Sequence, residues 1–162
     1  METLSRPHPQ VRDSFRAAMR QIASTVTIVT AADGDRHHGM TMTAVGSLSM
    51  DPPSMFICTN QSTFLHDIIQ SAQNFCVNVL RRDHVALSTV FSGRTPPEEK
   101  FKVGEWIVEN GVHMLSDAQA NVLCKKVAAV PFGTHTIFIG TVIDVRLNED
   151  GAPLLYRNAS YF

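Results

Sequence analysis

Residues 38–53 read His-Gly-Met-Thr-Met-Thr-Ala-Val-Gly-Ser-Leu-Ser-Met-Asp-Pro-Pro, and the interpretation of the rest of the chain starts from this stretch. Residues 40–44 alternate between larger apolar or small residues and threonines, which is the two-residue period of a β-strand. Residues 45–50 are rich in small and hydroxyl side chains, and Asp51-Pro52-Pro53 ends the segment. Small side chains let a ligand approach the backbone N–H and C=O groups, and hydroxyls suit an anion. The residues alone leave two interpretations open: a ligand-contacting strand, or a half-buried strand that runs into a polar loop.

The length and composition indicate one globular domain over residues 1–162. Hydrophobic residues make up 44% of the chain and charged residues 18%, which is usual for a packed core. A formal net charge of −1 without a basic stripe argues against nucleic-acid binding. No apolar run approaches the roughly 18 residues of a membrane span. Residues 1–11 are polar, so we expect no signal peptide or anchor there, a flexible arm over residues 1–10 and a cytoplasmic location.

The cysteines and histidines do not have the spacing of a metal site. Cys58, Cys76 and Cys124 are far apart and each lies in an apolar run, which predicts buried, unreactive thiols without a disulfide framework. His37 and His38 are adjacent, so on a strand they point to opposite faces. We therefore predict no metal ligands.

Periodicity predicts many short strands with two or three helices. An amphipathic helix is expected over residues 11–22, a helix capped by Ser62 or Thr63 follows the first strands, and another is capped by Asp83. Strands are expected over residues 25–30, 37–45, 54–58, 74–80, 118–130 and 137–147, the last with its isoleucines, valine and leucine (Ile137, Ile139, Ile143, Val145 and Leu147) on one face. We also expect a hairpin around Asn110-Gly111, Lys125-Lys126 at a polar edge, and residues 153–156 closing the sheet. This pattern favours a closed or nearly closed β-barrel and disfavours a doubly wound parallel sheet.

Several motifs in fixed order resemble the short-chain flavin reductase family. Residues 39–53 match the pattern Gly-x-Thr-x-x-x-x-x-Ser-x-Ser-x-Asp-Pro-Pro, and Thr-Val-Thr-Ile-Val-Thr at residues 25–30 precedes it. Further matches are Phe-Ser-Gly at residues 91–93, Lys100-Phe101, Glu105-Trp106, Gly-Thr-His at residues 133–135, and Pro-Leu-Leu-Tyr at residues 153–156 with Tyr161. The resemblance runs from about Phe15 to Tyr161, nearly the whole chain.

This resemblance implies a mainly β, FMN-binding split β-barrel of Greek-key type, usually a homodimer with the flavin near the subunit interface. The implied activity is NAD(P)H:flavin oxidoreductase, the reductase component of a two-component flavin-dependent monooxygenase. NADH or NADPH would reduce FMN or FAD, and the reduced flavin would diffuse to an oxygenase that acts on an aromatic compound. The nicotinamide would stack on the flavin, which agrees with the absence of a Gly-x-Gly-x-x-Gly fingerprint.

The resemblance also implies the site residues. The backbone of Met40, Thr41, Met42, Thr43 and Ala44 would contact the edge of the flavin ring, and His135 would lie at the nicotinamide as the catalytic residue. The ribityl and phosphate groups would be held by Asn60, Ser62, Thr63, Ser47, Ser49 and Lys100, and the remaining contacts would come from Leu48, Phe91, Ser92, Gly93, Phe101 and Tyr161. The chain departs from the family at Thr134, where aspartate is usual, and at Ala159, where glycine is usual. For His135 a strand-entry histidine bonded to backbone stays open as the alternative. Closure of the barrel stays open for Tyr161, and helix capping without a ligand for Ser62 and Thr63.

Two other functions are compatible with the residues. One is a protein of the same barrel that holds flavin tightly as an electron carrier or sensor. The other is a pyridoxine phosphate oxidase-like enzyme, which we disfavour because the chain lacks a basic phosphate-binding cluster.

Overall fold

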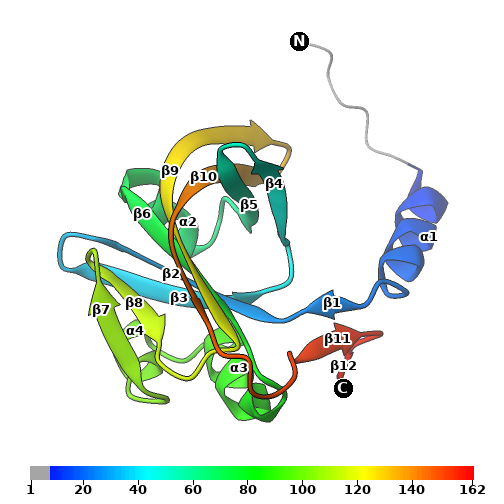
Figure 1. Cartoon of the computed structure of the whole chain (residues 1–162). Helices are drawn as coiled ribbons and strands as arrows, with labels where there is room; N and C mark the ends of the chain where they lie inside the picture. The colour runs from blue at the N-terminus through cyan, green and yellow to red at the C-terminus, as the bar shows by residue number, and fades with distance from the viewer. Residues whose placement is uncertain (1–7) are drawn as a thin grey trace.

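The main sheet has seven antiparallel strands in the computed structural model, which describes residues 8–162 (Figure 1). The strands are β2 (Thr27–Asp33), β3 (Arg36–Met42), β4 (Val45–Met50), β5 (Pro53–Asn60), β6 (Asn74–Val79), β9 (Ala120–Phe132) and β10 (His135–Leu147). Their order across the sheet is β3-β2-β6-β9-β10-β5-β4. The predicted mainly β architecture is therefore confirmed.

The sheet curls into a barrel because its two edge strands follow each other in the chain. Only Thr43 and Ala44 separate β3 from β4, and three peptide steps reach at most about 11 Å. The backbone N–H of Cys58 in β5 donates to the carbonyl of Ala44 at 2.9 Å, which ties this link to the sheet. Within residues 8–162, β3 and β4 form no ladder with each other, so the barrel stays open along this seam. This is the split barrel that the resemblance implied.

The link between β3 and β4 corrects one prediction. We expected a single strand over residues 37–45 followed by a polar loop, whereas β3 ends at Met42 and residues 45–50 form the separate strand β4. Small residues disfavour a strand by propensity, but pairing with β5 overrides this preference. Gly46 lies under the ring of Phe56, where a Cβ atom would come within 2.8 Å of a ring carbon. A larger residue would push the two strands apart.

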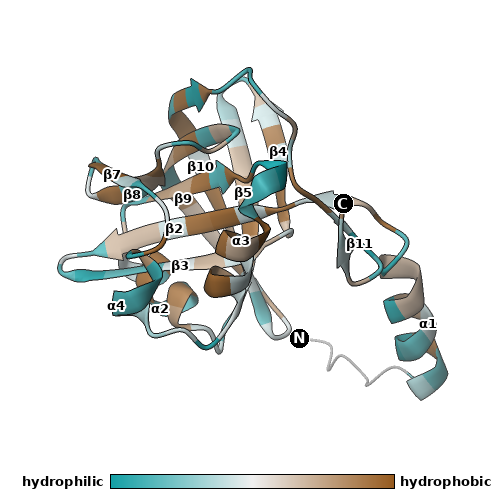
Figure 2. Ribbon diagram, turned by 90° about the horizontal axis from the view of Figure 1, so that it is seen from below, coloured by the Kyte–Doolittle hydropathy of each residue, from teal (hydrophilic) through white to brown (hydrophobic). Residues whose placement is uncertain are grey.

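Helices and a hairpin cover both faces of the sheet (Figure 2). Helix α2 (Phe64–Ser71) packs on a hydrophobic cluster inside the barrel, the first core. Because side chains alternate between the two faces of β2, Val29 and Ala31 both belong to this core. The second core includes Ile28 and is covered by α3 (Val85–Ser92), α4 (Pro97–Lys100) and the hairpin of β7 (Trp106–Glu109) and β8 (Val112–Leu115). The hairpin turns at Asn110-Gly111, as predicted.

A second, small sheet corrects the expectation for the C-terminus. Residues 153–156 do not close the main sheet; β11 (Leu155–Arg157) pairs with β1 (Ser24–Thr25) and β12 (Ser160–Tyr161). The turn between β11 and β12 keeps a glycine-like conformation, since Ala159 has φ 61° and Asn158 has φ 49°. Helix α1 (Pro9–Met19) lies beside this sheet and away from the barrel in Figure 1. Its predicted apolar face is exposed, Phe15 to 63%.

Two predictions about β9 and β10 are also corrected. Lys126 does not lie at a polar edge, because β9 is an interior strand; its Nζ donates to the carbonyls of Ile69 and Gln70 at the end of α2, at 2.7 and 2.6 Å. The isoleucine and valine run of β10 does not form one face, because the register shifts between Val142 and Asp144. The core side of β10 instead presents Thr136, Phe138 and Gly140.

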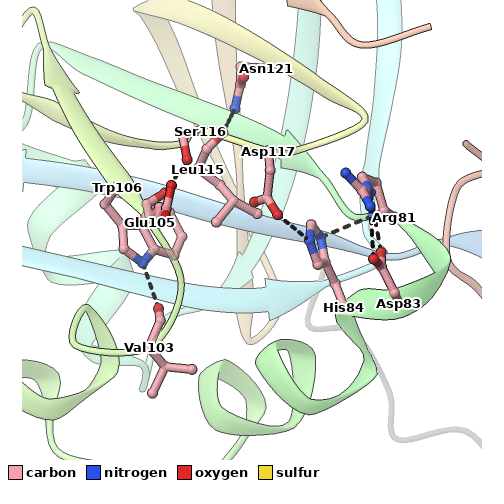
Figure 3. A network of polar contacts seen from close by, with 10 residues as sticks. All are labelled: Arg81, Asp83, His84, Val103, Glu105, Trp106, Leu115, Ser116, Asp117 and Asn121. Carbon is pink, nitrogen blue, oxygen red and sulfur yellow. Dashed lines mark hydrogen bonds and ion pairs between the residues drawn. The ribbon is translucent and has the colours of Figure 1, made fainter. Parts of the chain in front are cut away.

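The start of α3 differs from the expected cap (Figure 3). Asp83 lies inside the short 3₁₀ turn η1 (Arg82–His84) and its carboxylate binds Arg81 at 2.8 Å. Residue 84 takes the cap position instead. The buried ring of His84 is held from two sides, by the N–H of Arg81 at 3.2 Å and by the carboxylate of Asp117 at 3.2 Å.

The expected N-terminal arm lies partly outside the described residues. Residues 1–7 are not described, but α1 already begins at Pro9, so residues 9 and 10 are helical rather than part of an arm. Cys58, Cys76 and Cys124 are free thiols; Cys76 and Cys124 are buried as predicted, whereas Cys58 is only half-buried. No helix among residues 8–162 has the length and apolar character to cross a membrane.

Candidate functional site

The sheet register brings His135 against the loop that begins α2. His135 is the first residue of β10 and lies opposite Asn60, the last residue of β5. The tight turn before it, Gly133-Thr134, joins β9 to β10. The backbone N–H of Gln61 donates to the carbonyl of Thr134 at 2.9 Å and holds the two segments together. The expected nicotinamide residue and the expected phosphate residues therefore share one corner of the barrel.

The N-terminus of α2 presents donors suited to an anion. The Oδ1 of Asn60 accepts hydrogen bonds from the N–H and the hydroxyl of Ser62, both at 2.9 Å. The hydroxyl of Thr63 donates to the carbonyl of Asn60 at 2.8 Å and accepts from the N–H of His66 at 3.3 Å, so Thr63 is the helix cap. The next backbone N–H groups lie at the positive end of the helix dipole. Such a helix start attracts a phosphate.

The end of β3 exposes backbone rather than side chains. The side chain of Met42 is buried in the first core, and Met40 packs against the same core. The hydroxyl of Thr41 donates to the carbonyl of Ser88 in α3 at 2.7 Å. In the described part of the chain the N–H groups of Thr43 and Ala44 have no protein acceptor, and both residues are exposed. These two amides can donate to the polar edge of a planar ligand.

The neighbouring residues of β4 also face solvent. Leu48 is 53% exposed and Ser47 is exposed, whereas Ser49 is half-buried and its hydroxyl bonds the backbone of Asp51. A cavity of about 550 Å³ is lined at the seam by Thr43, Val45 and Met55 and otherwise mostly by residues of β1, β2, β6 and β9, so it lies apart from His135 and the start of α2. Its volume lies in the range of small-molecule sites.

Other expected contact residues lie in the interior or at the far side of α3. Phe91 is fully buried, and Lys100 is 3% exposed. The Nζ of Lys100 donates to the carbonyls of Gly39 and Phe91 at 3.2 and 3.3 Å, and burial lowers the pKa of the ammonium. This arrangement offers no support for a phosphate contact by Lys100. Its cation instead binds one carbonyl in the last turn of α3 and one in β3, which ties the helix to the strand.

The remaining expected residues lie in the same buried region around α3 or at its exposed edge. Phe101 stacks among aromatic rings, with its ring centre 4.3 Å from that of His113. The hydroxyl of Tyr161 lies 2.9 Å from that of Ser88, so this tyrosine packs on α3. Ser92 and Gly93 are exposed at the end of α3, where both bond the carbonyl of Thr89.

A buried histidine links β3 to α2. The ring of His38 meets that of Phe64, the first residue of α2, edge to face at 5.2 Å between centroids. Burial, followed by the charges of Lys100 and His37, lowers the pKa of His38 from 6.5 to about 4. His38 is therefore neutral at neutral pH and acts as a packing residue between the two parts of the site.

Sequence reasoning missed Gln61, Thr136 and His66, which form hydrogen bonds around His135. Nothing in the sequence marked them, because their side chains meet only through the pairing of β5 with β10. The departure at Thr134 also has a structural consequence. Its hydroxyl lies 2.9 Å from the Nδ1 of His135, so the ring has a polar neighbour without the usual aspartate.

The chain is similar over nearly its whole length to proteins of known class. The family model of the flavin reductase like domain matches residues 19–162. The chain is 51% identical over 154 residues to the reductase component of an FADH(2)-dependent resorcinol hydroxylase from Rhizobium sp. (strain MTP-10005), covering 93% of this chain and 86% of that protein. It is 36% identical over 148 residues to the FMN reductase (NADH) RutF of Agrobacterium fabrum, covering 91% and 85%. The solved structure of the flavin reductase PheA2 in its native state matches with a TM-score of 0.84 and 30% identity, covering 96% and 97%. The chain therefore belongs to the family of the flavin reductase-like domain.

Proposed function

We propose that the protein is an NAD(P)H-dependent flavin reductase that supplies reduced flavin to a partner monooxygenase. The observation that carries this proposal is the meeting of His135 with the start of α2, whose backbone amides suit an anion. It lies next to the seam, where the N–H groups of Thr43 and Ala44 have no acceptor within residues 8–162. A bound FMN or FAD would supply the redox chemistry by accepting a hydride from the nicotinamide. Relatives with 51% and 36% identity carry names that specify FADH(2) and FMN with NADH, so both flavins are candidates.

In this proposal the protein acts mainly by positioning. The N–H groups of Thr43 and Ala44 contact the polar edge of the ring, and Asn60, Ser62 and Thr63 hold the ribityl and phosphate groups. His135 orients the nicotinamide so that donor and acceptor atoms come within about 3–3.5 Å. Because a hydride passes directly between two bound molecules, no acid–base pair of the chain is required.

The test is NADH and NADPH oxidation with added FMN or FAD. We expect oxidation that scales with free flavin; a tightly held flavin that does not respond to either nicotinamide would favour the carrier or sensor instead. Ser62→Ala combined with Thr63→Ala should weaken flavin binding, and an unchanged affinity would contradict the phosphate site at α2. His135→Ala should raise the KM for nicotinamide far more than that for flavin. Equal effects would remove His135 from the nicotinamide site.

We further propose a homodimer in which the partner subunit covers the exposed site. Large apolar side chains face solvent close to it: Phe132, which lies opposite His135 in the ladder, is 68% exposed, and Val130 on the same strand is 49% exposed. Monomers rarely leave many such groups in water. Phe132→Glu should yield a monomer in light scattering with weaker flavin binding; an unchanged mass would contradict the interface.

The remaining proposals concern the context of the reaction. The oxygenase partner acts on an aromatic compound, as the name of the 51% identical relative suggests. A cytoplasmic location is supported by the three free thiols. We treat residues 1–162 as one domain, since β2 contributes to both cores. Coupled turnover with an oxygenase and a phenolic substrate tests the first of these statements.

A further inference from the structure

We propose that Gln61 and Thr134 are positioning residues that together hold His135 in place, Gln61 through the backbone and Thr134 through the ring. The proposal rests on the function proposed above, in which His135 lies at the nicotinamide. Neither residue is among the contacts that the sequence indicated.

Gln61 fastens the start of β10 to the loop before α2. Its backbone N–H donates to the carbonyl of Thr134 at 2.9 Å. Its side-chain Nε2 donates to the carbonyl of His135 at 3.1 Å. A carbonyl only accepts, so the amide nitrogen must face His135, and the orientation of the side chain is determined. Gln61, the residue after the last ladder pair of β5 and β10, thus donates to two consecutive carbonyls, those of Thr134 and His135.

The second hydrogen of the Gln61 amide begins a directed chain of hydrogen bonds. Nε2 also lies 3.4 Å from the hydroxyl oxygen of Thr136, which must accept. Thr136 is 4% exposed, and its own proton has one available acceptor in the described structure, the Nε2 of His66 at 3.0 Å. With Nε2 as the acceptor, the ring of His66 carries its proton on Nδ1, which lies 3.6 Å from the carboxylate of Asp67 and has no hydrogen bond within residues 8–162. The chain connects His135 to the first turn of α2.

Thr134 restrains the ring of His135. The Thr134 hydroxyl lies 2.9 Å from Nδ1, and no other protein group in residues 8–162 bonds the ring. Nε2 is therefore the nitrogen left to contact a ligand. Both residues are exposed, so without this bond the ring would be free to rotate, and the ligand would have to fix it on binding. The hydroxyl performs this task without adding a charge next to the imidazole.

The kinetic test uses paired variants of the full chain. Thr134→Val removes the hydroxyl at constant shape, and Gln61→Glu replaces the donor with an acceptor that repels the carbonyl of His135. Each should raise the KM for nicotinamide about three- to tenfold, the range for loss of one hydrogen bond, with flavin affinity within about twofold. Thr134→Ser should restore wild-type KM. Gln70→Glu, the same change on the exposed face of α2, is the matched control and should have no effect.

The double variant Thr134→Val with His135→Ala tests whether Thr134 acts through the ring. The Thr134→Val effect on KM should vanish in this background; its persistence would overturn the proposal. An equal rise in the KM for nicotinamide and in the KM for flavin would also overturn the proposal.

A spectroscopic test separates this inference from the proposed function. In ligand-free protein, Thr134→Val should shift the ¹⁵N resonance of His135 Nδ1, and Gln61→Glu should accelerate amide exchange at the start of β10. An unchanged Nδ1 resonance would overturn the role of Thr134 whatever the kinetics. If the resonance shifts while His135→Ala leaves the nicotinamide KM unchanged, the restraint stands and the nicotinamide role of His135 fails.

Discussion

Replacing His38 with phenylalanine should remove a loss of stability that the wild-type protein suffers below neutral pH. His38 is 8% exposed, its Nδ1 has no hydrogen-bond partner among residues 8–162, and its pKa is lowered from 6.5 to about 4, mainly by burial. At a pH between about 4 and 6.5, His38 is more often protonated in the unfolded chain than in the folded one, so the unfolded chain binds more protons. The free energy of unfolding therefore falls as the pH decreases through this window, and the contribution is fully present above pH 6.5.

The size of the effect follows from the two pKa values. The lowering of the pKa from 6.5 to about 4 corresponds to at most about 3.5 kcal/mol of unfolding free energy over the whole window, at about 1.4 kcal/mol for each pKa unit. Between pH 7.5 and pH 5.5 the linkage relation gives about 1.3 kcal/mol from His38 alone. Phenylalanine retains the edge-to-face contact with Phe64 and leaves no unpaired nitrogen, so the variant should fold at pH 7.5.

The assay is urea unfolding at pH 7.5, 6.5 and 5.5, followed by the fluorescence of the single tryptophan, Trp106. Burial also lowers the pKa of His113, but this residue is present in both proteins and its contribution cancels. We expect the wild type to lose about 1.3 kcal/mol more than the variant over this range. Identical losses in the two proteins would refute a buried neutral His38.

Three further stability predictions concern buried or strained residues. Asn78 is fully buried and its side chain bonds the carbonyl of Ile28 and the N–H of Leu115, so Asn78→Ala should cost about 3 kcal/mol by urea unfolding, because both partners lose their bond. Ala159→Gly should stabilise by about 1 kcal/mol, since Ala159 has φ 61°, and Asn158→Gly in the same turn should gain less because asparagine tolerates this region. Lys100→Met should cost about 1–3 kcal/mol, because two carbonyls lose their donor, and should speed amide exchange in β3 without changing the salt dependence of flavin binding.

The elements best predicted from the sequence are those that a local sequence pattern determines. The β-branched run in residues 25–30, the turn at Asn110-Gly111 and the helix after Thr63 are all local signals. The structure contains each element, although the strand begins as β2 at Thr27 and Thr25 belongs to β1. Strand β4 was missed because its small residues carry no strand propensity and form a strand only by pairing with β5. Lys126 was misplaced for a related reason. A charged residue normally indicates an edge, but here the end of α2 supplies two carbonyls to its ammonium.

For the candidate site, the motifs predicted which segments lie together but not the direction of each side chain. Asn60, Ser62, Thr63 and His135 meet as the motifs implied. Phe91 and Lys100 belong to equally good motifs, yet their side chains are buried under β3. A motif shows that a residue type is required at a position; it does not distinguish a contact with ligand from support of the strand that makes the contact. Gln61 shows the converse case, a residue in no motif whose position depends entirely on the partner strand.

The geometry of the site depends on a glycine far from it. At Gly140 on β10 a Cβ atom would lie 2.7 Å from the Cβ of Cys124 and 2.7 Å from the ring of Phe75, so only glycine fits at this crossing. The ladder with β9 shifts register between Ile139 and Gly140, which places the close contact at one position along the strand. A slip of one residue would turn every side chain of β10 to the other face and take His135 away from Asn60. The packing that excludes a side chain at Gly140 therefore also fixes the register of β10 and, with it, the position of His135. Gln61 and Thr134 can act on His135 only in this register.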